Sequence, residues 1–190
     1  MVANCIIVHG SPVRDKRGDK DYIPESEGNW IGWLKKRLED IGIRSYNPQM
    51  PESWKPKYEE WKKEFEKLEV NEDTILIGHS AGGAFLVRWL GGTGKKVKKL
   101  ILVAAAKTFD EEHKRLKELS DFNINSNIKN NVGEVIIFVS DNDIDIIKES
   151  ARIYEKALDA KLIEFHGKGH FSLGDLGTEE FPELLEEVLK

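Results

Sequence analysis

A serine flanked by glycines follows a short apolar run at residues 74–78. Ser80 is the central residue of Gly-His-Ser-Ala-Gly, and a helical pattern over residues 81–90 comes directly after it. A strand, a sharp turn and a helix in this order form a nucleophile elbow, in which glycines avoid clashes with the neighbouring strand and helix. The pattern predicts that Ser80 is a nucleophile. A tight glycine-rich turn without chemistry is the alternative.

A serine hydroxyl needs a general base, and His170 is the best placed of the five histidines. It lies in Gly-Lys-Gly-His-Phe, between the last predicted strand and the last predicted helix. Gly167 and Gly169 would let this loop turn back over Ser80. His79 is next to the serine, and we expect the elbow to point its side chain away. The remaining three, to which we assign no direct part in the chemistry, are His9, His113 and His166.

Three aspartates follow the apolar run at residues 135–140, namely Asp141, Asp143 and Asp145. A catalytic histidine needs a carboxylate that fixes its tautomer and stabilises the imidazolium. The chain order serine, aspartate, histidine is the order expected of a hydrolase sheet. Position alone does not choose among the three aspartates, because capping of the next helix is an alternative role for one or two of them.

Backbone N–H groups are expected to hold the oxyanion of such a site. One would come from Ala81, the residue after the nucleophile. The second would come from the loop after the first strand, where Gly10 and Ser11 follow His9. The sequence therefore predicts an oxyanion hole between two loops that are about 70 residues apart along the chain.

Short apolar runs alternate with amphipathic helical patterns along the whole chain, which predicts an α/β fold with a parallel sheet covered on both faces. Active sites of such sheets lie beyond the carboxyl ends of the strands, and the predicted serine, acid and base each follow a separate strand. We expect a single domain, 1–190, with about six strands. The predicted strands are at residues 5–9, 43–46, 74–78, 99–104, 135–140 and 161–166, and the predicted helices at 29–41, 54–68, 81–90, 111–120, 146–157 and 178–189.

The bulk composition narrows the class of protein. A net charge of −5 at pH 7 disfavours nucleic acid or an anionic membrane as the main partner. Cys5 is the only cysteine, so no intrachain disulfide forms, and no run approaches the roughly 18 apolar residues of a membrane span. We expect a cytoplasmic protein. Gly91–Lys96 does not match a phosphate loop, since it lacks the first glycine and a serine or threonine after the lysine.

With these residues placed, the chain resembles the small serine hydrolases related to retinoblastoma-binding protein nine and its bacterial counterparts. The resemblance covers nearly the whole chain and implies a compact, lidless α/β-hydrolase fold acting on small ester or amide substrates, with no metal or organic cofactor. It also implies that Asp143 is the acid, although Ile144 stands where proline is usual, and Asp141 is the alternative. The matching segments are His9-Gly10, NWIGWLKKRLE, Asn47–Pro51, IGHSAGG, LVAAA, FVSDND and GHF.

The sequence also gives expectations about the partners of the protein and about the residues that line its pocket. The Leu-x-Cys-x-Glu segment of the human relative is absent, so we expect a small-molecule substrate and no retinoblastoma-type partner. Trp30, Trp33 and Phe171 are candidate walls of an acyl pocket, and the alternative for the tryptophans is the core. The charged loop Val13–Ser26 either borders the pocket mouth or is only solvated. A protein-binding module on a hydrolase scaffold is the second functional hypothesis, and an intact set of three catalytic groups argues against it.

Overall fold

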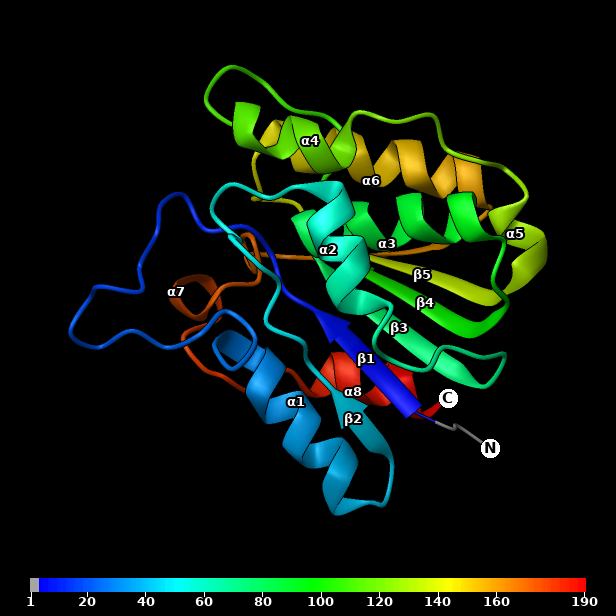
Figure 1. Ribbon diagram of the computed structural model, residues 1–190, viewed down its shortest axis with the longest axis horizontal. Coiled ribbons are helices and arrows are strands. Elements are labelled where there is room, and N and C mark those ends of the chain that lie inside the picture. The colour runs from blue at the N-terminus through cyan, green and yellow to red at the C-terminus, as the bar shows by residue number, and fades with distance from the viewer. Residues whose placement is uncertain (1–3) are drawn as a thin grey trace.

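Parallel strands form the centre of the molecule, in the order β2-β1-β3-β4-β5-β6 (Figure 1). The computed structural model describes residues 4–190, and within them every strand pairing of the sheet is parallel. The prediction of a parallel sheet of about six strands is therefore confirmed. The strands are β1 (Asn4–Val8), β2 (Arg44–Tyr46), β3 (Thr74–His79), β4 (Val97–Val103), β5 (Val132–Ser140) and β6 (Lys161–Phe165).

Helices cover both faces of this sheet, as Figure 1 shows. Helices α1 (Asn29–Asp40) and α8 (Pro182–Leu189) lie on one face, and α2 (Tyr58–Phe65), α3 (Ala81–Thr93) and α6 (Asp145–Leu158) lie on the other. No helix among residues 4–190 is both long and apolar enough to cross a bilayer. Shorter helical segments are η1 (Lys114–Leu116), α4 (Lys117–Ser120), α5 (Ile128–Asn131) and α7 (Leu173–Leu176).

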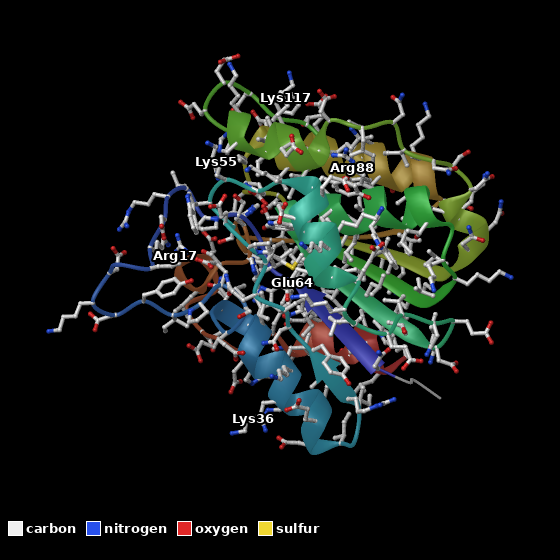
Figure 2. The ribbon with its side chains drawn as sticks, viewed as in Figure 1. Arg17, Lys36, Lys55, Glu64, Arg88 and Lys117 are labelled. Atoms are coloured by element: carbon white, nitrogen blue, oxygen red, sulfur yellow. The ribbon has the colours of Figure 1, made fainter. Side chains whose placement is uncertain are left out.

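Helix α1 shows how the sequence pattern determines which side of a helix is buried. Trp30, Leu34 and Leu38 are spaced four residues apart, so they lie on one side of the helix, and all three are fully buried. Lys36 belongs to the opposite, exposed side and is labelled at the edge of the molecule in Figure 2. This spacing of apolar residues packs one side of the helix against the sheet and leaves the charged side in water.

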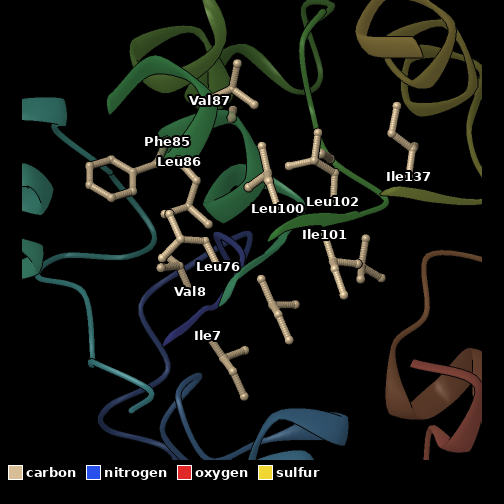
Figure 3. Close-up of a cluster of buried hydrophobic side chains, with 14 of the residues drawn as sticks. Ile7, Val8, Leu76, Phe85, Leu86, Val87, Leu100, Ile101, Leu102 and Ile137 are labelled. Atoms are coloured by element: carbon tan, nitrogen blue, oxygen red, sulfur yellow. The ribbon is translucent and has the colours of Figure 1, made fainter. Parts of the chain in front are cut away.

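The central strands are apolar on both faces because helices cover both. In β3, Ile75, Leu76 and Ile77 are all completely buried, although successive side chains of a strand point to opposite faces. Leu76 lies beside Leu100 of the next strand, and the branched side chains of this layer pack together in Figure 3. This packed centre holds the carboxyl ends of the strands, and therefore the loops that follow them, in fixed positions.

Three predicted helices differ from the observed ones by several residues. The last begins at Pro182 rather than at residue 178. The second begins at Tyr58 rather than at residue 54, because Pro56 disfavours the helical conformation of the residue before it. The prediction of a helix over residues 111–120 is wrong in extent, since only the short segments η1 and α4 form there. Only Leu116 and Leu119 give this polar stretch substantial apolar burial, which is too little to stabilise a longer helix.

Candidate active site

Ser80 stands at the turn between β3 and α3 in a strained backbone conformation, with φ 51° and ψ −117°. Four backbone hydrogen bonds hold that conformation in place. Its N–H donates to the carbonyl of Val103 at 2.9 Å, and its carbonyl accepts from the N–H groups of Gly83 and Ala106, each at 3.1 Å, and of Ala84 at 3.4 Å. The serine is therefore fixed by the neighbouring strand and by its own helix.

The glycines around Ser80 allow the helix to approach the sheet closely. A Cβ atom at Gly78 would lie 2.5 Å from the Cα of Gly83 in the following helix. One at Gly82 would collide with the carbonyl groups of Val8 and His9 at the end of β1. The predicted clashes with strand and helix are confirmed, and they explain why the elbow needs glycine at both positions.

Asp143 and His170 come together from two different loops. Asp143 follows β5 and His170 follows β6, and the imidazole Nδ1 lies 3.0 Å and 3.2 Å from the two carboxylate oxygens. The carboxylate side chain is only 2% exposed, whereas the imidazole is 33% exposed. An Nδ1–H that donates to the buried carboxylate leaves Nε2 as the basic nitrogen of a neutral ring.

Ser80 and His170 line the same pocket, which has a volume of about 170 Å³. Among residues 4–190, the Ser80 hydroxyl forms no hydrogen bond, and the imidazole of His170 bonds only to Asp143. Hydrogen bonds between catalytic groups are often long in unliganded structures and tighten when substrate binds. The pocket therefore contains both a free serine hydroxyl and an imidazole whose second nitrogen is unoccupied.

Asp141, the alternative acid, bonds to a different histidine. One of its carboxylate oxygens lies 2.8 Å from Nδ1 of His166, and the other accepts the N–H of Gly167 at 3.0 Å. These bonds lower the pKa of Asp141, and the hydrogen bond to its carboxylate raises the pKa of His166. The structure thus brings Asp143, and not Asp141, to His170.

The expectation that His79 points away from the site is wrong. Its Nε2 lies 2.9 Å from the carbonyl oxygen of His170, and the two imidazole rings are 5.1 Å apart. Burial, and then the nearby His170, lower the pKa of His79 to about 3. The ring is therefore neutral near pH 7 and donates its Nε2–H to the loop that carries His170. The one sequence signal that could have indicated this contact is the position of a histidine directly before the nucleophile.

The predicted oxyanion donors lie around Ser80. A Cβ atom at Gly10 would be 3.1 Å from the Cβ of Ser80, so the loop after β1 lies directly against the serine. The backbone N–H groups of Gly10, Ser11 and Ala81 have no hydrogen-bond acceptor among residues 4–190. His9 steadies this loop, because its Nδ1 bonds to the Gly10 carbonyl at 2.7 Å and its Nε2 accepts the N–H of Met50 at 2.9 Å.

The aromatic residues predicted as pocket walls do not line this pocket, and that prediction is wrong. Trp30 and Phe171 are completely buried, and the indole N–H of Trp30 donates to the Phe171 carbonyl at 3.1 Å. Phe171 stacks on Phe181 with ring centroids 5.4 Å apart. Trp33 is partly buried and packs against the core. The tryptophans therefore belong to the packing of α1, which was the alternative interpretation.

The loop Val13–Ser26 borders the pocket, which was one of its two alternative interpretations, and contributes Lys16 and Glu25. Burial raises the pKa of Glu25, but hydrogen bonds from Gln49, from Tyr22 and from Ser53 together lower it below its usual value. No group of three potential metal ligands occurs within residues 4–190. The pocket is lined by His9, Gly10, Ser11, Pro12, Lys16, Glu25, Asn29, Ile31, His79, Ser80 and His170.

Comparison with known proteins agrees with this geometry. A family model described as serine hydrolase matches residues 22–189. The chain belongs to the serine hydrolase family. Serine hydrolase RBBP9 of Rattus norvegicus is 32% identical over 163 residues, which are 84% of each chain. The YdeN protein of Bacillus subtilis is 26% identical over 190 residues, covering 96% of this serine hydrolase and 92% of the relative.

Solved structures confirm the α/β-hydrolase fold of this serine hydrolase. The crystal structure of the YdeN protein of B. subtilis superposes with a TM-score of 0.84 and covers 98% of this chain and 96% of that one, at 22% identity. Est1E of Butyrivibrio proteoclasticus, solved with ferulic acid bound, superposes with a TM-score of 0.60 at 14% identity, covering 98% of this chain and 90% of that one. At these identities the superpositions establish the fold alone.

Proposed function

We propose that this serine hydrolase cleaves small ester or amide substrates by two-step acyl transfer, with Ser80, His170 and Asp143 as its catalytic residues. One observation carries the proposal: the buried carboxylate of Asp143 bonds to Nδ1 of His170, while the other face of the imidazole shares a pocket with the strained Ser80. This is the relation of acid, base and nucleophile that acyl transfer needs.

In the first step, Nε2 of His170 accepts the proton of Ser80 as the serine oxygen bonds to the substrate carbonyl carbon. The carbonyl oxygen becomes an oxyanion, and we expect the N–H of Ala81 and an N–H of the Gly10–Ser11 loop to donate to it, since the loop lies against Ser80 and these groups have no other acceptor among residues 4–190. The protonated His170 then gives its proton to the leaving alcohol or amine, and the bond to that group breaks. Each oxyanion donor contributes about 3 kcal/mol to the stability of the transition state.

In the second step, water attacks the acyl-serine ester. His170 accepts a proton from the water, the oxyanion forms again in the same hole, and its collapse releases the acid and returns the proton to Ser80. Asp143 keeps the Nδ1–H of the ring pointed at its carboxylate and stabilises the imidazolium in both steps.

The size and lining of the pocket favour small polar substrates. A volume of about 170 Å³ is well below the roughly 300–1,000 Å³ of pockets that enclose drug-sized ligands. Lys16 and Glu25 bring opposite charges to its walls, whereas the large aromatic rings nearby are in the core. A long acyl chain would find little apolar surface here, so short-chain esters and amides are the expected substrates.

A fluorophosphonate probe, which phosphonylates activated serines, tests the proposal directly. We expect stoichiometric labelling at Ser80 by mass spectrometry, and no labelling of Ser80→Ala. The same variant should lose turnover of p-nitrophenyl acetate by about 10⁴-fold or more, with an unchanged circular dichroism spectrum. Unlabelled wild-type protein, or undiminished hydrolysis by Ser80→Ala, would refute the proposal. Of these two outcomes, unlabelled wild-type protein would also favour the second hypothesis, a binding module on a hydrolase scaffold.

A further inference from the structure

A second concavity, of about 490 Å³, lies apart from the catalytic pocket and shares no lining residue with it. Figure 2 labels Lys55, Arg88 and Lys117 in this region, where the segment before α2 comes close to α3 and α4. Six basic side chains line it. We call this concavity the basic groove, and its basic residues are Lys55, Lys57, Arg88, Lys114, Arg115 and Lys117.

The charges of the basic groove are largely unpaired. Two acidic side chains, Glu118 and Asp121, face six basic ones, which leaves an excess of four positive charges (six minus two) in a chain whose net charge is −5. Among residues 4–190, only Lys114 of the six has a carboxylate within ion-pair distance, Glu111 at 3.4 Å. Glu118 instead accepts the backbone N–H of Tyr58 at 3.3 Å.

Arg115 is the most informative of these side chains. Its Nε is buried and has no hydrogen-bond partner within residues 4–190, and burial lowers the pKa of the guanidinium. The side chain as a whole is only partly buried, but a buried N–H donor without a partner carries a desolvation cost that a bound anion would offset. An unsatisfied Nε–H on a residue that lines the basic groove therefore favours an anion-binding site there.

Arg88 presents a second guanidinium in a fixed orientation. Its Cζ lies 3.8 Å from the ring centroid of Tyr58, and its Nη1 donates to the Glu118 carbonyl at 2.7 Å. Guanidinium groups recognise phosphate through paired N–H donors, and lysines add mobile point charges. The aromatic face of Tyr58 is covered by Arg88, so it offers no stacking platform for a nucleobase.

We propose that the basic groove binds an oligophosphate, a chain of at least two linked phosphate groups. Two guanidinium groups from different elements, with lysines around them, match a ligand that carries several negative charges along its length. This proposal does not depend on the identity of the catalytic residues, because the groove and the catalytic pocket have no residue in common.

Isothermal titration calorimetry with inorganic tripolyphosphate tests the proposal on the full chain. We expect saturable binding by the wild type, weakening steeply between about 50 mM and about 200 mM salt. Arg115→Gln should weaken binding by about tenfold or more, and Arg88→Gln should act in the same direction. Lys96→Gln is the matched control, since it removes one charge from an exposed lysine outside the groove and should leave binding within about twofold.

The companion titrations decide the kind of ligand. Orthophosphate should bind at least about tenfold more weakly than tripolyphosphate, and a poly-glutamate peptide more weakly still. Absence of tripolyphosphate binding by folded wild type would overturn the proposal. Equal weakening in Lys96→Gln would also overturn it, because the attraction would then be diffuse. Equal or tighter binding of orthophosphate or of the peptide would show that an oligophosphate is not the ligand recognised.

Discussion

Two aspartate–histidine pairs lie side by side at one end of the sheet, and they differ mainly in burial. Asp143 with His170 and Asp141 with His166 draw their carboxylates from the turn after β5 and their imidazoles from the loop after β6. The shortest Nδ1 to oxygen distances are 3.0 Å and 2.8 Å. The side chains of the first pair are 2% and 33% exposed, and those of the second 44% and 88%.

The comparison shows that a short distance between a carboxylate and an imidazole does not by itself bury the pair or bring a nucleophile next to it. In the exposed pair, water competes for every donor and acceptor, and no nucleophile adjoins the ring. In the buried pair, the low dielectric strengthens the bond, and the free face of the imidazole opens into the pocket of Ser80. Asp141 also holds the loop through the N–H of Gly167, so its role is to shape the segment that carries His170.

The largest expected effect is the difference in kcat between the variants Asp143→Asn and Asp141→Asn. Loss of the buried carboxylate removes the group that fixes the tautomer of His170, so kcat for p-nitrophenyl acetate should fall by about 10²- to 10⁴-fold. Asp141→Asn should change it by no more than about threefold, because an amide oxygen can still accept the N–H of Gly167. Steady-state kinetics on both variants, with thermal unfolding as the control, measures the difference. A reversed order would make Asp141 the functional acid.

A smaller effect on kcat is expected from His79, which contacts His170 of the buried pair. His79→Phe removes the donor to the His170 carbonyl and should lower kcat by about 10- to 100-fold while changing KM little. His79→Gln keeps an N–H donor and should restore part of the loss. Equal kcat values for the two variants, both well below wild type, would show that the imidazole does not act through this hydrogen bond.

The depressed pKa of His79 also predicts an acid-sensitive stability. Between about pH 6.5 and about pH 3 the unfolded chain binds a proton that the buried ring does not, so stability from this site falls as the pH is lowered. Urea unfolding of wild type and His79→Gln at about pH 7 and about pH 4 measures the contribution as a difference of differences. We expect the wild type to lose the larger free energy of unfolding, by about 1 kcal/mol or more. Equal losses would contradict the buried neutral ring.

The exposed pair of Asp141 and His166 should have the smallest effect on stability. Its dependence on pH should be opposite to that of His79. The raised pKa of His166 means that its ion pair stabilises the fold below about pH 6.5, provided that Asp141 is ionised. This contribution is lost as the pH rises through the folded pKa of His166. Titration followed by NMR should place that pKa above the value in Asp141→Asn. The same pKa in both proteins would show that the pair does not persist in solution.

Local patterns were enough to predict the elements that position the site. Apolar runs buried on both faces predicted the parallel strands, and Gly-His-Ser-Ala-Gly behind one of them predicted the elbow. These predictions succeed because burial and turn geometry depend on residues that are close together in the chain. The helix predicted at residues 111–120 did not form, because its hydrophobic surface was too small for packing to stabilise more than about one helical turn at a time.

Local sequence patterns could not determine which of two neighbouring aspartates bonds to His170. Asp141 and Asp143 are two residues apart and have the same chemistry, and the resemblance to known hydrolases favoured Asp143 while the residues alone did not. Which carboxylate meets His170 depends on how the loop after β6 folds over the turn after β5. Trp30 and Phe171 were assigned to a pocket for a similar reason, since aromatic residues near a site pack in the core as readily as they line a cavity.

The amino-acid sequence by itself determined the order of strands and helices, the strained turn at Ser80 and the placement of polar groups after three strands, because each follows from residues near one another. Only the tertiary structure decided which aspartate is buried against His170, that His79 supports the loop of that histidine, and that mostly unpaired cations from three segments gather in the basic groove. Those outcomes depend on burial and on contacts between distant segments, and both exist only once the chain has packed.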